Sequence, residues 1–501
     1  MFHFGIDLPE SVEREEMSVM TDKDFIEREI ARWKVSKRRQ EMLIGQRYFS
    51  GDHDILLKRR TAIGENGEPV EIQNIPNNRI VDNQYAKMVV QKSNYLLGQP
   101  LTWQSDNKAF TDALNDLCGK RFHKLMKNLS KDVQNEGIGW IFPTYDENGY
   151  FVFKKLMGHE IIPGWRDGDH TILEYAIRVY PMLSYTKNNE EIIEKVEVYD
   201  ETGISYFELD GGTLVPEEPY HQPYFFMLDE KTGINYGYNW SKIPLIAFKR
   251  DSKEIPLIRK VKSLQDALND ILSNFKNGMD EDPRNTILVL VNYDGENLGE
   301  FRRNLATYGA VKVKTVDGAA GDLRTLEIKV NSENYKSIIE IIKKAIIENA
   351  MGYDAKDDRL GGQPNQMNIQ SMYSDIDLDT NETETEFQAA FEELVWFIRC
   401  HFANSGIGNF ENDRLEVIFN RDLPMVESEV ISNIRESIGI LSDETLIAQH
   451  PWVDDVQAEL ERKRKQDLQE KEDLFGESNP FSNQNRNKDQ NSNNNGGGDD
   501  E

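Results

Sequence analysis

The sequence contains only two cysteines, Cys118 and Cys400, among its 501 residues. Two cysteines cannot build a disulfide framework, and because each lies in an apolar pattern of helical spacing, we expect both to be buried thiols. Long apolar runs are also missing. The longest, Ile-Leu-Val-Leu-Val at 287–291, is far shorter than the ~20 apolar residues that span a bilayer. The first residues lack both a basic region and a long apolar stretch. We therefore expect a soluble, intracellular protein without a membrane segment.

The motifs of common enzyme chemistries are absent as well. The sequence has no Walker loop, no G-x-G-x-x-G, G-x-S-x-G or H-E-x-x-H motif and no paired C-x-x-C. The eight histidines show no ligand spacing. We therefore predict a protein that is not an enzyme and that carries no cofactor and no metal. The alternative from another class is a metal-dependent nuclease that uses clustered carboxylates, which would lose its turnover in EDTA.

Two acidic clusters have carboxylates spaced closely enough to suggest a metal site, but neither is interpreted as one. One has the spacing of an EF-hand loop, but Thr380 stands where the sharp turn of that loop requires glycine. Its four carboxylates are Asp375, Asp377, Asp379 and Glu386. The other, residues 280–282, lies in a predicted turn before Pro283 and is interpreted as surface acidity.

Positive charge is scarce. The chain has 59 basic and 88 acidic residues, which gives a formal net charge of −29. A protein that grips DNA normally presents a basic surface, because neutralising phosphates releases counterions. Net charge of this size is also explained by solubility alone. Any role with DNA must therefore be one that does not grip the duplex.

The first half of the chain predicts an α+β body. Apolar residues at helical spacing, such as Ile26 and Ile30, predict a helix over 24–48. An Asn-Gly turn predicts a hairpin tip at 65–68. Short alternating runs separated by Gly- and Asp-containing turns predict a β-rich region over 138–250. Three more helices are predicted at 83–97, 107–118 and 120–135.

The second half changes character. A helix over 256–276 and another over 333–351 flank a small β-α-β unit at 284–330. A loop at 353–368 leads to a long helix over 369–402. Its middle, 379–386, has no apolar residue, which predicts a kink or a solvated crossing. The predicted parts of the inserted unit are strands 286–291, 310–314 and 324–330 and a helix at 298–306. Further predictions are a strand at 415–419, helices near 427–440, 444–449 and 454–473, and a disordered tail from Ser478.

Several short segments, in their order along the chain, resemble one known family. They are Asn78-Arg79, residues 95–102 (Tyr-Leu-Leu-Gly-Gln-Pro-Leu-Thr), Ser105-Asp106-Asn107, residues 292–297 (Asn-Tyr-Asp-Gly-Glu-Asn), Gly361-Gly362, residues 441–445 (Leu-Ser-Asp-Glu-Thr) and His450-Pro451. No single segment is specific, but together, across roughly 40–465, they resemble the portal (head–tail connector) proteins of siphophages that infect Gram-positive bacteria.

This resemblance implies a portal fold with named parts. They are a flexible segment 1–22, a wing 23–252, stem helices 253–282 and 332–352, a clip 283–331, a tunnel loop 353–368, a long kinked helix with a wing strand 369–425, a helical crown 426–474 and a disordered tail 475–501.

The resemblance also implies a function and partners. The expected protein is a ring of about twelve subunits at one capsid vertex, through which double-stranded DNA is packaged and ejected. Its expected partners are the terminase large subunit, the major capsid and scaffolding proteins and a head–tail adaptor, and its location is the virion and, during assembly, the host cytoplasm. The alternative within the same class is another phage ring or adaptor protein that never lines a DNA channel, although adaptors are usually much smaller chains.

Candidate site residues follow from the implied parts. The DNA-channel candidates are Lys260, Lys262, Lys343, Lys344, Asp354, Lys356, Arg359, Gly361 and Gly362. The candidates for partner binding at the clip are Asn292, Tyr293, Asp294, Glu296, Arg302 and Arg303.

Overall fold

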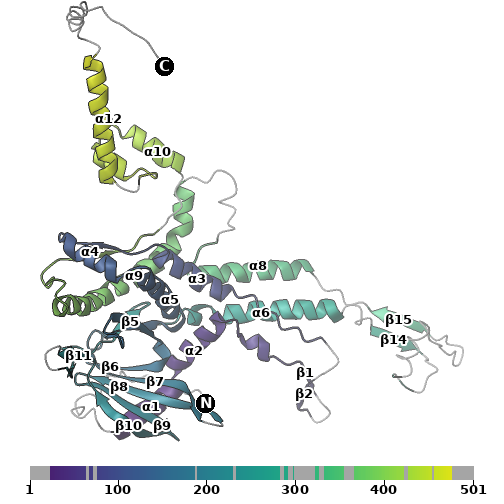
Figure 1. The fold of residues 1–501 in the computed structure, drawn as a ribbon. Helices are drawn as coiled ribbons and strands as arrows, with labels where there is room; N and C mark the ends of the chain where they lie inside the picture. The colour runs from purple at the N-terminus through teal and green to yellow at the C-terminus, as the bar shows by residue number, and fades with distance from the viewer. Residues whose placement is uncertain are drawn as a thin grey trace, which may run out of the picture. The chain divides into compact units, whose positions relative to one another are not determined.

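The computed structural model has a mixed α+β architecture in two compact units (Figure 1). Unit 1 comprises residues 1–355 and 372–422, and unit 2 comprises 356–371 and 423–501. The residues that the structure describes are 23–63, 67–71, 76–186, 189–229, 233–281, 287–291, 297, 299, 322–326, 332–354, 366–421, 427–453 and 456–476.

Unit 1 begins with two helices where the sequence predicts one. Helix α1 (Lys23–Val35) and helix α2 (Lys37–Phe49) are separated at Ser36, whose backbone is extended and whose side chain accepts a hydrogen bond from the Arg39 amide. The prediction of one helix was wrong because Ser36 acts as an N-cap that starts a new helix. The next three predictions agree with α3 (Gln84–Leu97), α4 (Lys108–Leu117) and α5 (Lys120–Glu136).

The largest sheet is a five-stranded antiparallel meander covered on one face by α1. Its order is β10-β9-β8-β7-β6. Ile26 and Ile30 of α1 are buried in the same core cluster as Ile177 and Val196 of the sheet. The strands are β6 (Ile161–Trp165), β7 (Leu173–Thr186), β8 (Asn189–Asp200), β9 (Gly203–Asp210) and β10 (Thr213–Gln222).

The main core lies around a three-stranded antiparallel sheet in the order β13-β4-β5. Strand β4 (Ile138–Tyr145) is buried along almost its whole length, between β5 (Phe151–Leu156) and β13 (Ile246–Lys249). Phe248 contacts the rings of Phe387 and Phe391 from a long helix further along the chain. Segments far apart in sequence therefore share one core.

Two-stranded pairs and single-turn helices complete this part of unit 1. The antiparallel pairs are β1 (Thr61–Ile63) with β2 (Pro69–Glu71), β3 (Thr102–Gln104) with β16 (Glu416–Ile418), and β11 (Phe225–Asp229) with β12 (Ile234–Tyr238). The single-turn helices are η3 (Asp54–Leu57) and η4 (Gly158–Glu160). The first pair confirms the predicted hairpin, and β16 confirms the predicted strand.

The remaining helices of the body are α6 (Ile258–Glu281), α8 (Ser332–Asn349) and α9 (Gln366–Asn404). Between α6 and α8 in sequence, β14 (Ile287–Val291) pairs antiparallel with β15 (Asp322–Leu326). The helix predicted at 298–306 and the strand predicted at 310–314 lie outside the described residues.

Helix α9 corrects one expectation. A solvated crossing at 379–386 is wrong, because Asp379, Thr380 and Thr383 are buried. The absence of apolar residues there leaves a polar face that packs against other polar groups.

The described part of unit 2 is helical. It contains α10 (Glu427–Glu436), α11 (Asp443–Ala448) and α12 (Val456–Gly476), in agreement with the three predicted helices. Ser442 caps α11 by accepting from the Thr445 amide, and Lys463 of α12 pairs with Asp443 at 2.9 Å. Across both units, no described helix combines the length and apolar character of a membrane span.

The two cysteines are free thiols that pack at the edge of the main core. Cys118 and Cys400 are only partly buried, so the expectation of buried thiols was wrong in degree. Both residues pack against the margin of the main core cluster, so solvent still reaches one side of each.

Candidate functional site: a helix pair and a buried ionic junction

Helix α6 carries a row of buried polar side chains inside its otherwise apolar face. The row recurs every four residues and therefore lies on one side of the helix. Each member accepts hydrogen bonds from backbone amides in the segment 78–85, which precedes and enters α3. The bonds are Asn78 N to Asn277 Oδ1 at 2.7 Å, Ile80 N to Ser273 Oγ at 2.9 Å, Asp82 N to Asn269 Oδ1 at 3.0 Å and Tyr85 N to Gln265 Oε1 at 3.0 Å. We call these four residues the α6 polar row.

The polar row positions an extended chain along a helix. Gln265 also donates to the Asp82 carbonyl at 2.8 Å, so the backbone amide and the backbone carbonyl of Asp82 both have hydrogen-bond partners on α6. Buried backbone amides need such partners, because an unpaired one costs about 1–3 kcal/mol. The sequence contains this row as polar residues at four-residue spacing, but the row was not predicted. Its members are Gln265, Asn269, Ser273 and Asn277.

Helices α6 and α8 pack against each other and against α3. Val261 and Leu268 of α6 share a buried cluster with Ile346 and Ile347 of α8 and with Met88 of α3. Further along the pair, the rings of Phe275 and Tyr335 lie 4.9 Å apart. This packing makes α6 and α8 a helical hairpin rooted on α3 (Figure 1).

A buried ionic junction lies where α3, α9 and the chain before α6 meet. Asp379 of α9 accepts from Lys92 Nζ of α3 at 2.6 Å and from Arg250 Nη2 at 2.7 Å. The side chains of all three residues are at most 2% exposed. Lys92 also donates to the Met351 carbonyl at 3.0 Å, just after α8 ends. The junction therefore fixes the chain at both sides of the segment 355–365.

Burial and the neighbouring charges shift the pKa values of Lys92 and Asp379 at this junction. Burial lowers the pKa of Lys92 to about 8, although the Asp379 carboxylate opposes that shift. Burial also disfavours the charged form of Asp379, but Arg250 and Lys92 outweigh it and hold its pKa below the usual value. A buried pair of this kind is costly to break, because removing one partner leaves an uncompensated charge.

All four predicted channel lysines have a carboxylate of the same subunit within 4.0 Å. Lys262 contacts Asp54 at 2.6 Å and Asp266 at 2.7 Å, and these bonds raise its pKa although burial opposes them. Lys343 pairs with Asp82 at 2.7 Å, and Lys260 lies 3.5 Å from Asp379. Lys344 lies 3.9 Å from Glu348, one turn further along α8, and with 77% of its side chain exposed it is the most exposed of the four.

Of the other predicted site residues, the structure describes only Asp354. Asp354 is half-buried near the start of the predicted loop. The remaining candidates lie outside the described residues, so their contacts stay predictions. They are Lys356, Arg359, Gly361, Gly362, Asn292, Tyr293, Asp294, Glu296, Arg302 and Arg303.

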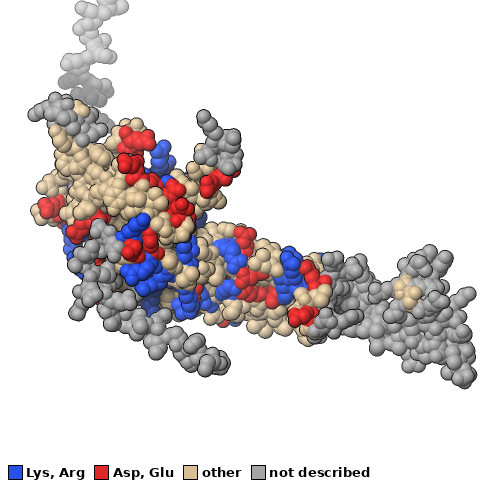
Figure 2. Space-filling model, turned by 90° about the horizontal axis from the view of Figure 1, so that it is seen from below, with Lys and Arg blue, Asp and Glu red and all other residues tan. Residues whose placement is uncertain are grey.

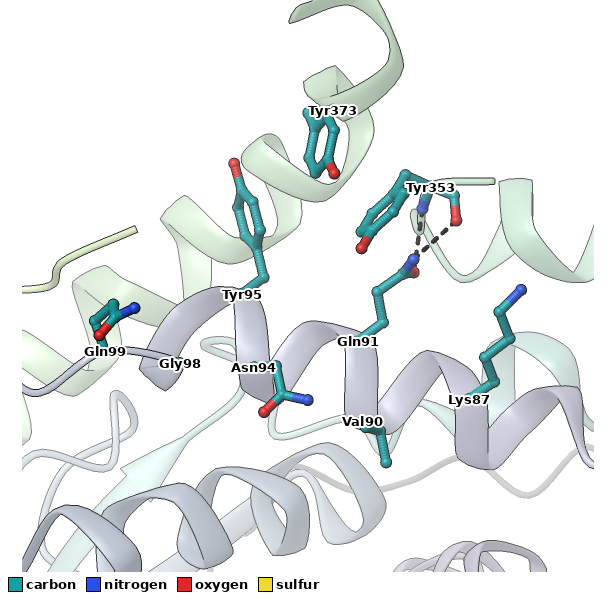
Figure 3. A pocket seen from close by; sticks show the side chains of 9 residues that line it. All are labelled: Lys87, Val90, Gln91, Asn94, Tyr95, Gly98, Gln99, Tyr353 and Tyr373. Carbon is teal, nitrogen blue, oxygen red and sulfur yellow. Dashed lines mark hydrogen bonds between the residues drawn. The ribbon is translucent and has the colours of Figure 1, made fainter. Parts of the chain in front are cut away.

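A hollow of about 330 Å³ lies beside this region (Figure 3). Its α3 wall presents Lys87, Gln91 and Asn94, and Gln91 is hydrogen-bonded to the backbone of Tyr353. Tyr353 and Tyr373 lie 4.4 Å apart, centroid to centroid. The hollow has no catalytic constellation, and the described residues hold no group of three potential metal ligands.

The surface over the helix pair is mixed in sign. Figure 2 shows acidic and basic side chains alternating over α6, without a continuous basic surface. Such a surface is suited to a polyanion that passes by and is poorly suited to one that is held.

Comparison with known proteins indicates the phage portal proteins as the class. Residues 30–473 match the family described as "Phage portal protein, SPP1 Gp6-like", and the chain belongs to this family. It is 30% identical over 426 residues to the portal protein of Bacillus phage SPP1, covering 84% of this chain and 83% of the relative. It is 27% identical over 432 residues to the portal protein of Clostridium phage phiCD119, covering 84% and 91%.

More distant likeness extends to solved structures of gene transfer agent particles. The neck of the native particle, computed with C12 symmetry, has 14% identity, a TM-score of 0.37 and coverage of 73% of this chain and 88% of that chain. The virion of the native particle has 14% identity, a TM-score of 0.36 and coverage of 72% and 87%.

Family membership confirms several predictions. The resemblance to portal proteins of phages with Gram-positive hosts was correct. The chain is a structural component of the virion and not an enzyme, because that is what the family comprises.

Proposed function

We propose that this chain assembles as a ring of about twelve copies at one capsid vertex, and that the ring is the channel for packaging and ejecting double-stranded DNA. The proposal rests on family membership together with the electrostatics of the helix pair.

The observation that carries the DNA proposal is the internal pairing of the lysines on α6 and α8. Lys260, Lys262 and Lys343 each have a carboxylate of the same subunit within 4.0 Å. A lysine already paired has little to gain from a phosphate, so few counterions are released on DNA binding. A duplex can then slide in both directions without being trapped.

The parts of the chain take roles within this proposal. The wing comprises residues 23–252 and, with the strand of 369–425, faces the capsid and scaffolding proteins. Helices α6 and α8 are the stem that lines the channel, and residues 283–331 are the clip that meets the terminase large subunit and later the head–tail adaptor. Residues 353–368 are the tunnel loop, and the helices of 426–474 form the crown.

Electron microscopy in negative stain with mass photometry tests the ring. We expect particles with a central channel and a mass of roughly twelve times 57.9 kDa. A stable monomer that binds duplex DNA tightly at physiological salt would contradict both the ring and the sliding channel.

A further inference from the structure

One outer face of α5 carries an unpaired basic stripe in a strongly acidic protein. Its lysines recur at the i, i+4, i+7 and i+11 positions that place them in one line along the helix. The stripe lies opposite the buried face of α5, which holds Phe122 and Met126. None of its side chains forms an ion pair or hydrogen bond with any residue in the described part of the chain. The basic stripe is Lys120, Lys124, Lys127 and Lys131, with Arg121 beside it.

Helix α9 carries an acidic stripe with the same spacing. Glu382, Glu386 and Glu393 occupy the i, i+4 and i+11 positions, with the small residue Ala389 at i+7. No described cation lies within 4.0 Å of these carboxylates. Lys242 and Lys249 act on Glu393, and Lys249 acts on Glu386, only at longer range. Each stripe covers eleven residues of helical rise, about 16 Å.

The two stripes lie on different helices of one subunit. The inner faces of α5 and α9 meet in the main core, where the rings of Phe122 and Phe391 lie 6.5 Å apart. The basic stripe lies on the far side of α5 from that core, and the acidic stripe flanks the buried face of α9, which holds Phe387 and Phe391. A head-to-tail contact needs two different, complementary patches on one subunit, and a head-to-tail contact that closes makes a ring.

We propose that the basic stripe of α5 docks on the acidic stripe of α9 in the neighbouring copy of this chain. The inference rests on the proposed ring and names the surfaces that order its subunits. Matched charges of this kind steer encounter and exclude wrong orientations more than they add affinity, so assembly should weaken as salt rises.

Charge reversal tests the pairing. The basic-stripe variant carries Lys124→Glu with Lys127→Glu, and the acidic-stripe variant carries Glu382→Lys with Glu386→Lys. Each alone places like charges in contact, so we expect each to need at least tenfold more protein than the parent to form rings. In an equimolar mixture every junction again joins opposite charges if the two variants alternate, so we expect mixed rings at the parental concentration, seen by mass photometry.

Matched control variants distinguish the loss of stripe pairing from a general effect of reversing surface charge. Lys37→Glu and Glu201→Lys change exposed residues elsewhere on unit 1 and should leave assembly unchanged. Circular dichroism and thermal melting confirm that each variant is folded. If a reversal does not fold, Lys124→Gln with Lys127→Gln repeats the test with neutral side chains.

The possible outcomes distinguish failure of the proposed function from failure of this inference. A parent chain that forms no ring overturns the proposed function and this inference together. If the parent and both variants form rings at the same concentration, only the inference is overturned. The inference is also overturned if both variants are folded but their equimolar mixture forms no rings at the parental concentration. Intact rings with weaker DNA binding in the basic-stripe variant would instead make the stripe a nucleic-acid surface and also overturn the inference.

Discussion

At the scale of the residue, Asp379 shows how one carboxylate organises three chain segments. Its side chain forms ion pairs with Lys92 of α3 and with Arg250, which follows β13. It also lies 3.5 Å from Lys260 of α6. Thr383, one turn later, donates to the Arg250 carbonyl at 3.0 Å. The charged middle of α9 is therefore an anchor, and its lack of apolar residues follows from that role.

Asp379→Asn should strongly destabilise unit 1. The substitution removes the negative charge that offsets Lys92 and Arg250, and breaking a buried pair in this way costs about 3–5 kcal/mol. Urea unfolding followed by tryptophan fluorescence measures the loss. Asp375→Asn, which changes an exposed carboxylate on the same helix, is the control and should be nearly neutral. Equal unfolding midpoints for the two variants would contradict this account of the junction.

His159 provides a pH-dependent prediction. Burial lowers its pKa, but the hydrogen bond and charge of the fully buried Glu136 outweigh burial and raise the pKa above 6.5. A raised histidine pKa contributes stability that is fully present below about pH 6.5 and is lost as the pH rises through the folded-state pKa.

His159→Gln should therefore cost more stability at acidic than at alkaline pH. The measurement is the difference in unfolding free energy between parent and variant at about pH 5.5 and about pH 8.5. His221→Gln serves as the control, because His221 contacts only neutral groups, Ser205 and the Thr202 carbonyl. A difference for His159→Gln that is constant or grows with pH would be inconsistent with a charged pair.

At the scale of the element, α6 combines an apolar face with the polar row that holds residues 78–85. Asn269 is a central member, since it accepts from the Asp82 amide and also contacts Gln265 and His53. Asn269→Ala leaves buried polar groups without partners, so we expect a loss of about 1–3 kcal/mol. Asn274→Ala on the exposed side of α6 should cost little, and thermal melts of the two variants compare them directly.

The inserted region between α6 and α8 gives a test of function. Deleting 284–330 should leave ring assembly largely intact and abolish DNA packaging, because the proposed clip would no longer meet the terminase. Electron microscopy scores the rings, and an in vitro packaging assay scores DNA protected from nuclease. Packaging that survives the deletion would remove the clip assignment.

Most elements could be predicted from the sequence because they follow local periodicity. The helices α3, α5, α6 and α8 have clear apolar faces, and their bounds agree with prediction within a few residues. The break at Ser36 was missed because a serine within a helical pattern is compatible with both a continuous helix and an N-cap.

The candidate site was less predictable because its contacts join distant segments. Lys92 and Asp379 are 287 residues apart, and no spacing rule connects them. The four candidate channel lysines lie on α6 and α8, the two helices that the sequence predicts, but their partners depend on tertiary packing. Asp54 and Asp82, which neutralise Lys262 and Lys343, lie on segments that only the fold brings near.

At the scale of the whole molecule, the net charge of −29 and the internally paired lysines imply weak binding of duplex DNA. We expect affinity no tighter than the non-specific range of about 10⁻⁴–10⁻⁶ M at physiological salt. Fluorescence anisotropy of a labelled duplex over a range of salt concentrations measures it. Lys344→Ala, which removes the exposed lysine, should reduce the binding further, and Lys262→Ala should reduce it less. Nanomolar binding by the parent would be incompatible with a sliding channel.

The polar row of α6 has a mechanical consequence. A helix bound to a neighbouring strand of chain at four successive turns cannot roll about its long axis without releasing all four bonds at once. Displacement of α6 along its own axis does not face the same barrier if the segment 78–85 moves with it. A push on the far end of α6 would therefore reach α3 as the motion of one stiff unit, which carries the force into the body of the subunit.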